Sequence, residues 1–404
     1  MGEIEKTSDG KLAETAKELL AYRDNIISEV YNRPMLTTKN ITLIEGLSEK
    51  RKKFDALWKE IEEKPDSAFE NPFYKEATKI FVDQNMDIIS SLEAKIRLRT
   101  AACVSDSKSH FINCLAEEGM SISDLDNLVE DYKESFRKDR ELESWDIDFK
   151  KSADNGQEYM AQGMKFKQEL DALATKIFKM PVNTELKIQY GENSSNYYFM
   201  HESNISFQPF VPELYSAIAH EGPFGHQIHE KLSEESYFPN HKDFRLTNEG
   251  LAMLGQKIAL KAVYADSKVD VAEFIMSNDF KNIAFQAAIE KLVFYDRLDS
   301  DAVAERLAPT DVMKKVIKST VREFDNDGLR IQRPKIVQYY AGFKKINQIS
   351  GAARDVIMNN PNLNAVQKRD FLYEAIKRMY TGFRRPEIMK REIDLYLRRN
   401  KLIA

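Results

Sequence analysis

Apolar residues recur every three or four positions along most of the chain, which is the spacing of one face of an α-helix. The first such segment covers residues 11–32, where Leu12, Leu19 and Ile26 stand among charged residues, and it stops before Pro34. Proline cannot continue a helix, so this stop is expected. The same rhythm predicts further helices over residues 41–62, 73–114, 122–142, 160–178, 212–232, 245–264, 271–298, 310–324, 334–358, 365–379 and 386–397.

The pattern changes after Pro181. The segments TELKIQYG and NYYFMHESNISFQPF carry Thr, Ile, Tyr and Phe in short runs with partial alternation, and Gly191-Glu192-Asn193 lies between them. β-branched and aromatic residues around a turn sequence are typical of short strands. We therefore expect a small β-hairpin, or a pair of edge strands, next to the helix that begins at residue 212.

These elements predict a mostly α fold, with a cleft in one large helical domain. Gly and Pro number 15 and 12 among 404 residues, so few obligatory turns interrupt the helices. We expect a helical N-terminal lobe over residues 1–180 and a metal-binding catalytic lobe over residues 181–404, joined in one continuous structural unit.

Charge and composition exclude several functional classes. The net charge is −5, so no strongly basic face for a nucleic acid is expected. No apolar run of about eighteen residues occurs, and the first residues lack the apolar core of a signal peptide, so we expect no membrane partner. Cys103 and Cys114 are eleven residues apart, roughly 16 Å along a helix and too far for a disulfide. A reduced, cytoplasmic protein is the expectation.

Histidine marks the candidate chemistry. Five of the six histidines fall within 41 residues, at His201, His220, His226, His229 and His241. The centre of this cluster reads AHEGPFGHQIHE. We expect His229 to face the core, and ordinary roles for His201 and His241.

In an HExxH helix the two imidazoles lie four residues apart on one side and share a zinc ion. Here His226 follows His220 by six residues, about 240° around an ideal helix. Pro223 lacks a backbone donor and Gly225 tolerates unusual dihedral angles, so a widened turn could absorb the two extra residues. We therefore predict a metal-binding helix with a two-residue bulge.

A third ligand is expected on the following helix, in LTNEGLAMLGQKIAL. Glu249 is the candidate, and Gly250 beside it would allow close approach of another backbone. Two histidines and one glutamate, with a fourth position for water, form a hydrolytic zinc site. Glu221 would take a proton from the attacking water and pass it to the leaving group. The alternative is that this His-Glu pair lies on an ordinary helix surface.

The chain resembles the family known as domain of unknown function 885, helical proteins similar to gluzincin metallopeptidases. The family signature is approximately HExxPGHH, followed by EGWALYAE on the next helix. HEGPFGHQ and EGLAMLGQ are the counterparts here, and RPKIVQYYAGFKKINQI resembles a later family segment. The resemblance covers roughly residues 185–404 and implies a gluzincin-like fold.

The resemblance also implies roles for individual residues. His220, His226 and Glu249 would be ligands of one Zn²⁺ ion, or of another divalent metal, and Glu221 would be the catalytic acid and base. Tyr339 or Tyr340 could stabilise an oxyanion, although core packing is an equally simple role for both.

The chain departs from the family pattern in the turn and around the metal. Proline comes one place early, at Pro223, and Phe224 stands where the family has Pro. Gln227, Leu251 and Gln256 stand where the family has His, Trp and Glu. Metal binding is therefore better supported than turnover. The expected activity is hydrolysis of a peptide or small-molecule amide. The alternatives are a non-peptide substrate or another metal at the same site, and a non-catalytic binding protein of the same fold.

Overall fold

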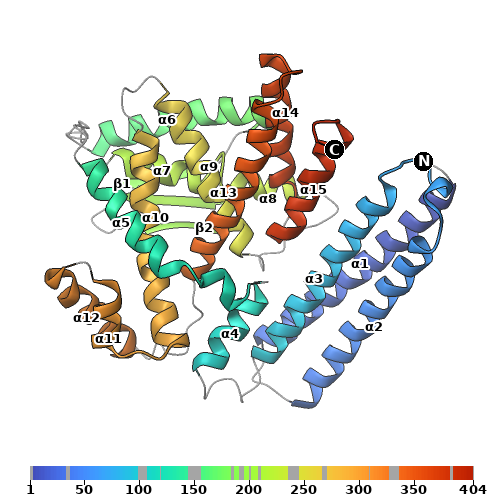
Figure 1. Cartoon of the computed structure of the whole chain (residues 1–404), viewed down its shortest axis with the longest axis horizontal. Coiled ribbons are helices and arrows are strands. Elements are labelled where there is room, and N and C mark those ends of the chain that lie inside the picture. The colour runs from blue at the N-terminus through green and yellow to red at the C-terminus, as the bar shows by residue number, and fades with distance from the viewer. Residues whose placement is uncertain are drawn as a thin grey trace. The chain divides into compact units, whose positions relative to one another are not determined.

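A computed structural model describes the chain in Figure 1. It describes all residues except 1–2, 33–36, 99–106, 119, 144–155, 183–185, 191–194, 200–201, 208–210, 235–244, 266–270, 309, 327–335, 383–384 and 404. The described residues are mostly α-helical and include one small β-sheet, so the predicted mostly helical fold is confirmed.

The chain forms two compact units, each built from separated segments. Unit 1 comprises Met1–Asp124, Lys291–Pro334 and Glu387–Ala404, and unit 2 comprises Leu125–Glu290 and Lys335–Pro386. The predicted boundary at residue 180 falls inside unit 2. The reason is that the helix before this point shares a core with the helix after it, where Phe166 stacks on Tyr215 with ring centroids 4.1 Å apart.

Unit 1 begins with three long helices that run side by side (Figure 1). They are α1 (Glu3–Asn32), α2 (Thr37–Glu62) and α3 (Tyr74–Leu98). Leu47 and Phe54 of α2 are seven residues apart, on one face of the helix, and both are fully buried. The remaining helices of this unit are α4 (Ser107–Glu117), α11 (Ser300–Leu307), α12 (Asp311–Asn326) and α15 (Pro386–Arg399).

Helix α15 packs against α3 within unit 1. Ile388 and Leu395 of α15 form an apolar cluster with Ile80 of α3. Beside this cluster, the Arg391 guanidinium donates to the Asp83 carboxylate over 2.5 Å. The C-terminal helix is therefore held to this unit by both apolar and ionic contacts.

Unit 2 carries the histidine cluster. Its helices are α5 (Leu128–Glu143), α6 (Gly156–Phe178), α7 (Val211–Glu221), α8 (His226–Glu234), α9 (Arg245–Val263), α10 (Val271–Glu290), α13 (Ile336–Met358) and α14 (Ala365–Tyr380). A short π-helical segment, Lys291–Tyr295, continues α10 into unit 1. Asn364 and Gln367 cap the start of α14 reciprocally, each side chain accepting from the other residue's backbone N–H.

The sheet of unit 2 has three strands in the order β1-β3-β2. Strands β2 (Ser195–Phe199) and β3 (Glu202–Phe207) pair antiparallel, and β1 (Leu186–Tyr190) pairs parallel with β3. The sequence predicted one hairpin, or two edge strands, from the segments TELKIQYG and NYYFMHESNISFQPF. The first segment forms β1, whereas the second forms both β2 and β3, so the antiparallel pair lies within the second segment and β1 joins it in parallel. Strands β2 and β3 neighbour α7, which places the sheet beside the helix that carries His220.

Helices α9 and α13 cross in backbone contact. A Cβ added at Gly250 would lie 2.5 Å from the carbonyl oxygen of Gly342, and one added at Gly342 would lie 2.1 Å from that of Leu246. Neither position can therefore carry a larger side chain without moving a helix. The predicted close approach at Gly250 is confirmed, and it fixes the position of Glu249, the residue directly before it.

Candidate metal centre

The chain between the two central histidines leaves the helix and re-enters it. Helix α7 ends at Glu221 and α8 begins at His226. The Gly222 N–H donates to the Ile218 carbonyl, but the Gly225 N–H donates back only to Gly222, closing a tight turn. The prediction of one helix with a two-residue bulge is thus corrected to two helices joined by the turn 222–225. Pro223 has no N–H to offer a continuing helix, which favours this break.

Gly225 makes the turn compact enough to bring the histidines together. A Cβ added there would lie 1.4 Å from the His220 carbonyl oxygen and 2.9 Å from that of Ala219. Any side chain would push α8 away from the last turn of α7. The turn therefore places His226 beside His220, with ring centroids 4.9 Å apart, although an ideal helix would point them apart.

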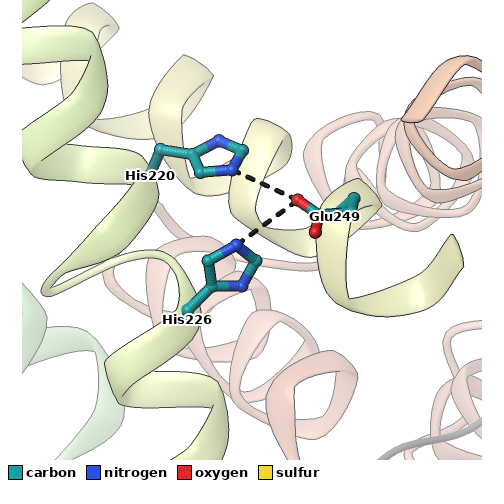
Figure 2. Close-up of side chains that lie close together, drawn as sticks. All are labelled: His220, His226 and Glu249. Atoms are coloured by element: carbon teal, nitrogen blue, oxygen red, sulfur yellow. Dashed lines mark hydrogen bonds and ion pairs between the residues drawn. The ribbon is translucent and has the colours of Figure 1, made fainter. Parts of the chain in front are cut away.

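The three predicted ligands converge in this structure (Figure 2). The Nε2 atoms of His220 and His226 each lie 3.3 Å from Oε2 of Glu249, which comes from α9. One nitrogen from each histidine and one carboxylate oxygen lie within 4.8 Å of one another. The His226 side chain is 8% exposed, that of Glu249 12% and that of His220 16%, so the cluster is largely screened from solvent and His220 is its most exposed member.

The outer nitrogens of both rings face side-chain amides. Nδ1 of His220 lies 3.3 Å from Oε1 of Gln256, and Nδ1 of His226 lies 3.0 Å from Oδ1 of Asn248. An amide oxygen only accepts, so in this arrangement both Nδ1 atoms donate. The Glu249 carboxylate beside the two Nε2 atoms also only accepts, so each ring faces an acceptor on both sides. A cation between the Nε2 atoms and the carboxylate would leave the proton of each neutral ring on Nδ1.

This donor set fits a divalent metal ion such as zinc. Zinc takes imidazole nitrogen and carboxylate oxygen at about 2.0–2.2 Å, which places neighbouring ligands of a tetrahedral ion about 3.3–3.6 Å apart. The two measured separations of 3.3 Å match that value. A metal ion could therefore be held by His220, His226 and Glu249.

The cluster holds protons tightly when no cation neutralises it. Burial lowers the pKa of the His226 imidazole, but the Glu249 carboxylate and the nearby Glu221 charge outweigh burial and raise it to about 9. Burial raises the pKa of the Glu249 carboxyl, but the two imidazoles outweigh burial and hold it well below its usual range. At neutral pH a metal ion must therefore displace a proton from His226.

We expect zinc affinity to rise with pH over an unusually wide range. On an ordinary histidine, whose pKa is near 6.5, protons no longer compete with a metal ion for the imidazole nitrogen above about pH 7. On His226 this competition continues to about pH 9. Apparent affinity should increase by up to about tenfold per pH unit between pH 7 and 9. Competition titrations against a chromophoric chelator would measure this slope, and an affinity that is constant above pH 7 would contradict it.

Tyr380 of α14 holds the turn 222–225 against α9. Its hydroxyl lies 2.6 Å from the Phe224 carbonyl oxygen and 2.9 Å from that of Leu251. The side chain is fully buried, and burial holds its pKa above the ordinary value, so the hydroxyl keeps its proton and donates. A Cβ at Gly255 would lie 1.8 Å from the same Phe224 oxygen, which shows how closely α9 approaches the turn.

Replacing Tyr380 by Phe should destabilise the protein while leaving the ring packing intact. Two buried carbonyl oxygens would lose their donor, which costs about 1–3 kcal/mol. Urea unfolding of Tyr380→Phe would measure the loss. Tyr373→Phe, on a partly exposed side of the same helix, is the matched control and should change stability by less than about 0.5 kcal/mol. Equal effects of the two substitutions would contradict the role given to Tyr380.

The other predicted site residues have different surroundings. Glu221 is buried at the end of α7, and its charge reaches His226. Tyr339 is partly buried, with its ring parallel to that of His220 at a centroid distance of 6.5 Å. Tyr340 is not brought to the cluster: it is fully buried, and its hydroxyl donates to Asp131 of α5.

His229 is buried, as predicted, and takes part in the hydrogen bonding around the ligands. Its Nδ1 lies 2.9 Å from the same Asn248 oxygen that faces His226, and its Nε2 lies 3.2 Å from the Gly382 carbonyl oxygen. His201 and His241 lie outside the described residues, as does Cys103.

Several residues around the ligands were not predicted from the sequence. They are Asn248, Asp279, Ser216 and Tyr380. Asn248 directly precedes Glu249, so its position next to a ligand was the one available signal. The others come from α7, α10 and α14, and no local pattern marks them.

Comparison with known proteins describes the fold only. No family model matches the chain, and no curated protein matches it. A crystal structure of a presumed lipoprotein from Colwellia psychrerythraea is similar at a TM-score of 0.52, with 12% identity over 89% of this chain and 70% of that one. This likeness supports the helical architecture.

Two further structures are similar at lower scores. One is a presumed lipoprotein of unknown function from Shewanella oneidensis, with a TM-score of 0.45 and 12% identity over 88% of this chain and 72% of that one. The other is metallocarboxypeptidase 1 of Trypanosoma cruzi, with a TM-score of 0.43 and 10% identity over 96% of this chain and 99% of that one. Among the residues that the structure describes, no helix is both long and apolar enough to cross a bilayer.

Proposed function

We propose that the chain is a metal-dependent hydrolase that cleaves a peptide or small-molecule amide, with Zn²⁺ held by His220, His226 and Glu249. One observation carries the proposal: two imidazole Nε2 atoms from two helices each lie 3.3 Å from one carboxylate oxygen of a third helix, and the three ligand atoms lie within 4.8 Å of one another. Outer amide groups hold both rings in the orientation that a metal needs. A surface ion pair has no reason to be supported in this way.

Zinc bound at this site would polarise the substrate carbonyl and activate a water molecule for attack. Glu221 is placed to handle the proton of that reaction, because it directly follows His220 and its charge reaches His226. Its carboxylate would accept the proton of the attacking water and deliver it to the leaving nitrogen.

Tyr339 would donate from its hydroxyl to the oxygen that becomes negative in the transition state. Its ring lies parallel to that of His220, the most exposed of the three ligands, at a centroid distance of 6.5 Å. The gluzincin-like cleft that the resemblance implies would have to open on this side. Tyr340 has no part in the proposal, because Asp131 accepts its hydroxyl proton.

A substrate panel tests the proposed function. Chelator-treated protein would be reloaded with zinc, manganese or cobalt and assayed on short peptides with free and blocked ends, on N-acyl amino acids and on simple amides. We expect hydrolysis of at least one amide class, abolished by chelator and restored by zinc. Stoichiometric zinc binding without hydrolysis of any amide would contradict the proposed reaction. Hydrolysis of esters alone would favour a non-peptide substrate at the same site.

A further inference from the structure

A short polar chain links the first metal ligand to a carboxylate on another helix. Oε1 of Gln256 faces Nδ1 of His220 at 3.3 Å. On its other side, Nε2 of Gln256 donates to Oδ2 of Asp279, on α10, over 2.6 Å, and to the hydroxyl of Ser216. The Ser216 hydroxyl itself lies 3.2 Å from the same Asp279 oxygen. Three helices, α7, α9 and α10, therefore contribute to one hydrogen-bonded chain that ends at His220.

The charge of Asp279 decides how the Gln256 amide is oriented. An ionised carboxylate only accepts hydrogen bonds, so the amide must present its NH₂ group to Asp279. The carbonyl oxygen of the same planar amide then faces His220 and accepts from Nδ1. Gln256 is 5% exposed and Ser216 is 7% exposed, so little water is present to satisfy a reversed amide. The Asp279 carboxylate, which cannot donate, therefore sets the direction of the hydrogen bonds between Asp279, Gln256 and His220.

We propose that Asp279 is a positioning residue of the metal centre, which selects the metal-binding tautomer of His220 through the amide of Gln256. The inference deepens the proposed function and rests on it where metal affinity is concerned. With Asp279 in place, the Gln256 oxygen faces Nδ1 and favours the tautomer of His220 that carries its proton there, which leaves the Nε2 lone pair for a metal ion beside Glu249. Without that carboxylate, the amide can reverse, and the proton can move to the nitrogen that should bind the metal.

The geometry separates this role from ordinary packing. Asp279 bonds to Gln256 and Ser216, and Gln256 in turn faces Nδ1 of His220, so the amide of Gln256 links the carboxylate to the ligand ring. Packing alone would be preserved by asparagine, which has nearly the same shape as aspartate. Asparagine can present either its NH₂ group or its oxygen to Gln256. It therefore removes the preference for one orientation of the Gln256 amide while it keeps the side-chain volume at position 279. Asp279→Asn therefore tests orientation and not size.

The most informative test is an exchange of the amide and the carboxylate. Four proteins would be compared: the wild type, Asp279→Asn, Gln256→Glu, and the double variant. In Gln256→Glu two carboxylates face each other, whereas in the double variant the new carboxylate can accept from His220 while the new amide donates to it. We expect each single variant to bind zinc roughly 10- to 100-fold more weakly, as for other residues that support metal ligands. The double variant should recover to within a few-fold of the wild type.

A second readout reports the tautomer directly in metal-free protein. Nitrogen-15 chemical shifts of the imidazoles, recorded at a pH where the rings are neutral, distinguish a proton on Nδ1 from one on Nε2. Glu249 accepts from Nε2 in all four proteins, so the comparison between them is what counts. We expect a larger share of Nδ1-protonated His220 in the wild type and in the double variant than in Asp279→Asn. A reading of this kind does not depend on activity or on the presence of metal.

A control variant separates the possible failures. Asp370→Asn, at an exposed position on α14, should have no effect on zinc affinity.

If the wild type binds no zinc, the proposed function fails, and the tautomer measurement alone decides this inference. An unchanged tautomer in Asp279→Asn, or a double variant in which the losses of affinity simply multiply, would overturn it. Should Asp279→Asn fold poorly, Gln256→Glu and the double variant provide the same comparison.

Discussion

Gly225→Ala is expected to abolish metal binding and to destabilise the protein by about 3 kcal/mol or more. The added methyl group would lie 1.4 Å from the carbonyl oxygen of His220 and 2.9 Å from that of Ala219. Both are backbone atoms, so relief requires α7 and α8 to separate. His226 moves with α8, and the shared position between the two imidazoles would be lost.

Gly351→Ala provides the matched control for this substitution. Gly351 lies in the interior of α13, and a Cβ there would meet no atom within 4 Å. The same chemical change should therefore stabilise the protein by up to about 1 kcal/mol, because alanine favours the helix. Thermal unfolding and zinc titration of both variants measure the contrast. A Gly225→Ala protein that binds zinc like the wild type would show that the turn does not position the ligands.

Glu221→Gln is expected to lower the turnover number by about 10²- to 10⁴-fold while zinc stays bound. Glutamine keeps the shape of the side chain but cannot accept the proton of the attacking water. Because Glu221 is not one of the three converging ligands, the metal content should be unchanged. The loss should appear in kcat more than in KM, since the proton moves only in the transition state.

Glu169→Gln is a suitable control for Glu221→Gln, because Glu169 is exposed on α6 of the same unit. It should leave turnover unchanged. Steady-state rates would be measured on whichever amide substrate the panel identifies, together with metal analysis of each protein. Turnover by Glu221→Gln within a few-fold of the wild type would remove Glu221 from the proposed reaction.

The helices of this protein could be predicted from the sequence because their apolar periodicity is strong. The predicted segments 245–264, 365–379 and 386–397 differ from α9, α14 and α15 by a few residues at most. Helix α11 was missed because it spans only Ser300–Leu307, although Asp299 before it accepts two backbone N–H bonds as an N-cap. Short helices that depend on a cap leave too few apolar positions for periodicity to detect.

The three ligands could be proposed because their residue types and order are chemically specific, but the path of the backbone between them could not. Pro223 and Gly225 predicted a disturbance, and the structure resolves it as a break between α7 and α8. Whether a helix bulges or breaks depends on what packs against the turn. Here the carbonyl of Phe224 is bound by Tyr380, a residue 156 positions away in the sequence.

Tyrosine roles were the least predictable feature of the site. Tyr339 and Tyr340 are adjacent in the sequence, but neighbouring residues on a helix point about 100° apart. One ring lies along His220, and the other hydroxyl bonds to Asp131 on α5. Only the packing of α13 against its neighbours decides which of the two meets the cluster, and that information is spread over the whole unit. The same holds for Asp279, whose link to Gln256 crosses between helices.

The most direct test of the central claim is the metal content of purified protein, compared between the wild type and His226→Ala. If His220, His226 and Glu249 form one metal site, elemental analysis should find about one equivalent of zinc or a similar divalent metal in the wild type and almost none in the variant. Reloading with zinc before analysis removes any dependence on purification history. A wild type that retains no metal after reloading, or a variant that retains as much as the wild type, would contradict the account.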